Sequence, residues 1–97
     1  MKLSFLIRKG SKLTTPLRSG WIQHNIDCVK ACALGSAVIA KHDQANWHIS
    51  SISEVAKEFP ESPLSFLFKV IAKNDRAING KFLSREEIAD WVETKGY

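Results

Sequence analysis

Cysteine, proline and methionine are scarce in this chain of 97 residues, which has two cysteines, three prolines and one methionine. Two cysteines are too few for the disulfide framework of a small secreted domain. The chain also lacks the run of about 20 apolar residues that a membrane-spanning helix requires. No repeat, low-complexity tract or Gly- and Pro-rich linker divides it, so we expect a single domain over residues 1–97.

We also find no export signal at the start of the sequence. The apolar run from Leu3 to Ile7 is shorter than a signal-peptide core and is ended by Arg8 and Lys9. We therefore expect a cytoplasmic protein whose two thiols are reduced.

The most apolar stretch of the chain runs from Cys28 to Lys41 and reads CVKACALGSAVIAK. At about 100° per residue its apolar side chains cover nearly the whole helical circumference, which is typical of a buried helix. The sequence thus predicts a buried central helix over about residues 28–41. Because glycine costs about 1 kcal/mol inside a helix relative to alanine, we expect Gly35 to serve close packing.

Helical patterns are also found before and after this stretch. Residues 3–8 are too few to decide between helix and strand, and Gly10-Ser11 is expected to end that element. Capping-box patterns begin helices at Ser51 and Ser84, and an apolar helix is predicted over residues 63–74. No segment alternates with the two-residue period of a strand. The predicted class is all-α, a compact bundle of four to five short helices around the central one.

Four short segments resemble a family of small bacterial and phage proteins of unknown function. They are Gly20-Trp21-Ile22-Gln23, Cys32-Ala33-Leu34-Gly35-Ser36-Ala37, Asn74-Asp75 and Glu86-Glu87-Ile88. The resemblance runs from about Gly20 to Trp91 and departs from the family where Ala31 replaces the usual aromatic residue. It implies a compact helical domain from a phage or mobile element, and it implies no activity.

Positive charge is concentrated in the N-terminal third, because residues 1–26 contain no acidic side chain. We expect residues 1–20 to form a less regular basic segment. A clustered basic patch is the electrostatic signature of nucleic-acid binding. This alternative function would use four residues for phosphate contacts: Arg8, Lys9, Lys12 and Arg18. The other interpretation is a solvated surface on which these charges do not converge.

Metal binding and catalysis find little support in the residue spacing. Cys28, Cys32, His42 and His48 match the paired spacing of zinc ligands only loosely. A thiol inside an apolar helix has a raised pKa and is a poor nucleophile. We therefore expect no metal, no cofactor and no enzymatic activity.

The leading functional hypothesis is a small binding protein that acts through another protein or through self-association, without contact to membranes. Aromatic residues are enriched where proteins bind one another, and polar pairs at helix ends can face a partner. The candidate partner-binding residues are Trp21, Trp47, Asn74 and Asp75.

Overall fold

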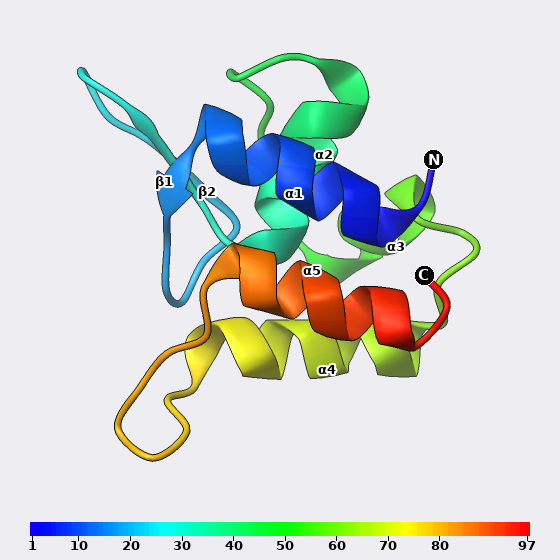
Figure 1. The fold of residues 1–97 in the computed structure, drawn as a ribbon. Helices are drawn as coiled ribbons and strands as arrows, with labels where there is room; N and C mark the ends of the chain where they lie inside the picture. Colours follow the sequence, from blue (N-terminus) through cyan, green and yellow to red (C-terminus); the bar gives the residue numbers. More distant parts are fainter.

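Five helices and three short strands make up the fold in a computed structural model that describes residues 1–97 (Figure 1). In chain order the elements are α1 (Leu3–Leu13), β1 (Thr15–Pro16), β2 (Ile22–His24), β3 (Val29–Ala31), α2 (Ala33–His42), α3 (Ile52–Glu58), α4 (Leu64–Asp75) and α5 (Arg85–Thr94).

The strands form one mixed sheet, in the order β1-β3-β2. Strand β3 pairs in parallel with β1 and antiparallel with β2. The prediction of an all-α protein is therefore wrong, and the chain adopts an α/β fold. Strands of two or three residues are too short to show an alternating pattern, so periodicity could not reveal them. Strands β2 and β3 form a hairpin that projects from the helices (Figure 1).

Helix α2 is the buried central helix, but it is shorter than predicted. It begins at Ala33 instead of Cys28, because residues 29–31 pair with both neighbouring strands. Every residue from Ala33 to Ala40 is buried, which confirms the apolar circumference as a signal of burial. Cys32 becomes the N-cap residue, and its Sγ accepts a hydrogen bond from the Gly35 backbone N–H at 3.3 Å.

Residues 3–8, for which the sequence left helix and strand open, are helical. They belong to α1, which continues through Gly10 to Leu13. The expectation that Gly10-Ser11 would end this element is wrong. A Cβ at Gly10 would lie 1.9 Å from the Ser36 carbonyl oxygen, so the glycine allows α1 to approach the backbone of α2. The segment of residues 1–20 thus contains a regular helix that packs against the central one (Figure 1).

The two predicted capping boxes have different outcomes. At α5 the Ser84 side chain accepts from the Glu87 N–H and the Glu87 carboxylate accepts from the Ser84 N–H, which confirms this helix start. At α3 the Ser51 side chain makes no capping bond, so that capping box is wrong. Glu54 instead accepts hydrogen bonds from the backbone and hydroxyl of Ser50, one residue earlier.

The hydrophobic core lies where α1, α2, α4 and α5 meet. Helices α4 and α5 lie side by side and run in opposite directions, with the chain ends on the same side of the molecule (Figure 1). None of the helices combines the length and apolar character needed to cross a membrane.

Candidate functional site

Asn74, near the end of α4, connects three parts of the fold and is only 1% exposed. Its Oδ1 accepts from the Ala33 backbone N–H at 3.0 Å, at the first turn of α2. Its Nδ2 donates to the Leu17 carbonyl oxygen at 2.9 Å and to Asp75 Oδ1 at 2.8 Å. Asn74 therefore supplies a hydrogen-bond acceptor that the start of α2 lacks and holds the loop before β2.

The loop of residues 17–20 is fastened to the same end of α4. Arg18 Nη1 donates to the Asn74 carbonyl oxygen at 2.9 Å, and the Ser19 backbone N–H donates to Asp75 Oδ1 at 3.1 Å. The carboxylate of Asp75 thereby accepts two hydrogen bonds from separate segments. The Asn74-Asp75 pair thus orders the loop that carries Trp21.

A cavity of about 200 Å³ opens between this loop, the start of α2 and the end of α4. Its walls are mostly apolar, and its polar groups come from the Asn74-Asp75 pair and Ser19. The lining residues are Ser19, Gly20, Trp21, Cys32, Leu34, Val70, Ile71, Asn74 and Asp75. The cavity therefore brings together residues from three segments that lie far apart in the sequence.

Gly35 explains how the loop reaches this position. A Cβ at Gly35 would lie 2.1 Å from the Trp21 carbonyl oxygen. The Cys32 backbone N–H donates to that same oxygen at 3.0 Å. Gly35 thus serves close packing as expected, but against the backbone of the Trp21 loop.

The thiol of Cys32 is 4% exposed at one wall of the cavity. Burial raises its pKa to about 11, although hydrogen bonds from the Gly35 and Leu34 backbone oppose this shift. A neutral thiol is a weak nucleophile and a weak metal ligand. Its position at a helix start, which usually favours a thiolate, is outweighed by desolvation.

Cys28 should react with a disulfide reagent at least about a hundred times faster than Cys32 at pH 8. At that pH the Cys32 thiol, with a pKa of about 11, is ionised in only about one molecule in a thousand. Cys28 is half-buried and Cys32 is buried. The measurement is the rate of thiol labelling of Cys28→Ser and Cys32→Ser variants under native conditions. Labelling of Cys32 should accelerate with pH up to about 11, and equal rates for the two variants would contradict the burial of Cys32.

The outer face of α4 carries an apolar stripe that leads to the cavity. Leu64 and Phe68 lie one helical turn apart and are 48% and 52% exposed. Ile71, the next residue on this face, is partly exposed and lines the cavity. The α4 stripe, defined as Leu64, Phe68 and Ile71, and the Trp21 cavity thus form one continuous feature.

The candidate partner-binding residues divide into two groups. Trp21, Asn74 and Asp75 meet at the Trp21 cavity. Trp47 lies elsewhere, stacked on His42 with ring centroids 3.9 Å apart. The Asn74 side chain caps the start of α2, where its Oδ1 accepts from the Ala33 N–H.

The basic residues of the N-terminal third do not present four free charges. Arg8 forms ion pairs with Asp90 and Glu93 of α5. Arg18 bonds to the Asn74 carbonyl and lies over the Phe82 ring, 4.6 Å from its centroid.

Lys9 and Lys12 remain exposed on α1. The acidic side of α5 packs beside α1 and pairs with Arg8, which a count of charges along the sequence could not show.

Arg85 is an interior residue that the sequence patterns did not identify. It is 6% exposed and donates to carbonyl oxygens of Ser11, Thr14 and Ala31 and to the Thr14 hydroxyl. Desolvation lowers the pKa of its guanidinium, and the nearby charge of Arg18 contributes. Because it bonds the carbonyls at the end of α1, Arg85 joins that helix to α5 and β3.

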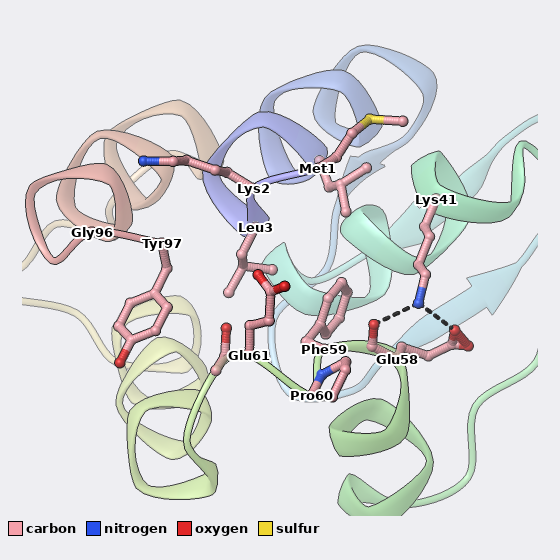
Figure 2. A pocket seen from close by; sticks show the side chains of 12 residues that line it. Met1, Lys2, Leu3, Lys41, Glu58, Phe59, Pro60, Glu61, Gly96 and Tyr97 are labelled. Carbon is pink, nitrogen blue, oxygen red and sulfur yellow. Dashed lines mark hydrogen bonds and ion pairs between the residues drawn. The ribbon is translucent and has the colours of Figure 1, made fainter.

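A second cavity, of about 380 Å³, lies between the start of α1, the end of α2 and the α3–α4 connection (Figure 2). Lys41 donates from Nζ to the carbonyl oxygen and the carboxylate of Glu58, at 2.6 and 3.2 Å. Burial disfavours the charge on Glu58, but hydrogen bonds from His42 and Lys41 outweigh it and lower the pKa of the carboxyl. Of the charged side chains labelled in Figure 2, Lys41 and Glu58 are thus paired with each other.

The cysteines and histidines considered as metal ligands do not converge. His48 lies beside His24, with ring centroids 4.7 Å apart, and His42 bonds to Glu58. No three His, Cys, Asp or Glu side chains are arranged to hold a metal ion.

Comparison with known proteins yields no relative: no protein-family model, no curated protein and no solved structure matches this chain.

Proposed function

We propose that this protein acts by binding another protein, without catalysis, through the α4 stripe and the adjoining Trp21 cavity. A single observation carries the proposal: Leu64 and Phe68, half exposed on one face of α4, lead directly to a cavity with apolar walls. Half-exposed aromatic and aliphatic side chains beside a pocket are typical of protein-binding surfaces. A second copy of the chain is the first partner to test.

The chemistry of the cavity supports a binding role. Its one thiol, that of Cys32, is held neutral by burial, and Asn74 and Asp75 use their polar atoms to order the protein itself. The proposal also places the protein in the cytoplasm, because both cysteines are unpaired and free thiols persist in reducing compartments.

Nucleic-acid binding through Arg8, Lys9, Lys12 and Arg18 receives less support as a second candidate. Two of these side chains are engaged within the protein, Arg8 with acidic residues and Arg18 with Asn74 and Phe82. Only Lys9 and Lys12 offer free charge on α1.

Light scattering after size-exclusion chromatography, over a wide range of concentrations, tests association with a second copy. The test variant is Leu64→Ser with Phe68→Ser, and the control is Phe5→Ser with Leu13→Ser on α1. The control pair is matched, because Phe5 and Leu13 are each 51% exposed. We expect the wild-type protein and the control to associate and the test variant to remain monomeric, with the same circular dichroism for all three.

A photo-crosslinking residue at position 68, compared with one at position 5, tests binding to a different protein in the cells that produce this chain. Specific crosslinks from position 68 to a protein that binds the purified chain directly would support the proposal. A strictly monomeric protein without crosslinks from position 68 above those from position 5 would refute it.

A further inference from the structure

A basic groove lies between α4 and α5, on a different face of α4 from the apolar stripe. Its volume is about 450 Å³, and its lining contains three lysines, two aromatic rings and no acidic side chain. The lining residues are Phe66, Lys69, Ala72, Lys73, Trp91 and Lys95. We call this feature the α4–α5 groove.

The three lysines converge because of the way the two helices pack. Lys69 and Lys73 are one helical turn apart on α4, and Lys95 is the C-cap residue of α5. The helices run antiparallel side by side (Figure 1). Both sources of charge therefore border the same groove. None of these lysines forms an ion pair. Unpaired like charges around one concavity attract an anion.

The acidic residues that would neutralise this groove are directed elsewhere. Asp90 and Glu93 of α5 pair with Arg8 of α1, and Glu87 is held in the capping box at Ser84. Residues 43–97 contain slightly more acidic than basic side chains, so a count of charges along this part of the chain conceals the local excess of positive charge at the groove. The packing of α5 against α1 on one side and against α4 on the other separates the two signs.

Aromatic rings form one wall of the groove. Phe66 stacks between Trp91 and Tyr97, with centroid distances of 5.1 and 4.5 Å. Trp91 is partly exposed, and Lys73 Nζ lies 4.6 Å from its ring centroid. An indole held in place by a stacked neighbour, with a cation over its ring, can bind a planar aromatic group that carries negative charge when the cation moves from the ring to that charge.

We propose that the α4–α5 groove binds a nucleotide unit, with its phosphate against Lys69, Lys73 and Lys95 and its base against Trp91. Proteins recognise single-stranded nucleic acids with two components: basic side chains that contact the phosphates, and aromatic side chains on which the bases stack. The volume falls within the range of small-ligand pockets, about 300 to 1,000 Å³. On binding, the flexible side chain of Lys73 leaves the indole face for the phosphate.

The same chemistry is present in a free nucleotide and in a single-stranded nucleic acid, and the probes separate the two. Calorimetric titrations use adenosine monophosphate and inorganic phosphate. Fluorescence anisotropy uses a labelled single-stranded oligothymidylate at several salt concentrations. An acidic peptide without aromatic residues serves as the competing anion.

The test variant is Lys69→Glu with Lys73→Glu, and its matched control is Lys9→Glu with Lys12→Glu on α1. The two double variants change the net charge by the same amount, and Lys9 and Lys12 are exposed away from the groove. We expect the groove variant to lose about tenfold or more in affinity and the α1 variant to stay within about twofold. Trp91→Leu should weaken nucleotide binding about fivefold and phosphate binding hardly at all.

Each outcome is decisive. Tighter binding of the monophosphate than of the oligonucleotide, per site, assigns the groove to free nucleotides, and the reverse assigns it to single strands. Equal losses in the two double variants would show attraction by net charge and overturn the proposal. So would equal affinity for the acidic peptide, or no binding of either nucleotide probe at low salt. Circular dichroism of each variant verifies that it is folded.

Discussion

The Asn74→Leu variant should have a free energy of unfolding about 3 to 4 kcal/mol below that of the wild-type protein. Leucine has a similar size but accepts and donates no hydrogen bond. The substitution leaves the Ala33 N–H and the Leu17 carbonyl oxygen without their partner. A buried polar group left without a partner costs about 1 to 3 kcal/mol, and this substitution leaves two such groups.

Urea unfolding monitored by circular dichroism measures this effect. Asp75→Asn is a suitable control, because the amide oxygen can still accept from the Ser19 N–H, and we expect a loss below about 1 kcal/mol. The Trp21 cavity should also lose its shape in Asn74→Leu, since Asn74 lines the cavity and bonds to Leu17 in the loop of residues 17–20. A variant as stable as the wild type would show that water replaces these hydrogen bonds without cost.

Replacing Gly10 by alanine should destabilise the protein by about 3 kcal/mol, although alanine is the better helix former by about 1 kcal/mol. The new Cβ would lie 1.9 Å from the oxygen and 2.3 Å from the carbon of the Ser36 carbonyl. Both are backbone atoms of a buried helix, so the clash is relieved only if α1 and α2 move apart. The steric cost therefore exceeds the gain in helix propensity.

Lys9→Ala is the matched control for this effect, because Lys9 is the adjacent exposed residue of α1. It should change the stability by less than about 0.5 kcal/mol. Combining Gly10→Ala with Ser36→Gly should not restore stability, since the closest contacts are with backbone atoms. A gain in thermal stability for Gly10→Ala alone would contradict the observed approach of α1 to α2.

The helices that could be predicted are those whose signals are local. Ser84 and Glu87 form their capping box within one turn, and the apolar circumference of α2 indicated its burial before any partner was known. Strands β1, β2 and β3 gave no such signal. Each has only two or three residues and exists because another strand supplies its hydrogen bonds, as where Thr15 pairs with Lys30.

The candidate site shows the same division. Trp21, Asn74 and Asp75 were recognised as unusual residue types, but their meeting at one cavity depends on contacts across more than fifty positions of sequence. Arg85 has the appearance of an exposed helix-start residue, yet it is 6% exposed because α1 ends beside it. Trp47 is as conspicuous in the sequence as Trp21 and lies away from the cavity, against His42.

By itself, the sequence determined the apolar helices, the start of α5 and the exclusion of a disulfide framework. These depend on interactions within a few residues or on composition alone. The tertiary structure alone decided that the chain before α2 forms a sheet, that Arg8 is neutralised by α5 and that the lysines of α4 and α5 share a groove. Such features arise from the relative orientation of elements distant in the sequence, which neither periodicity nor a count of charges contains.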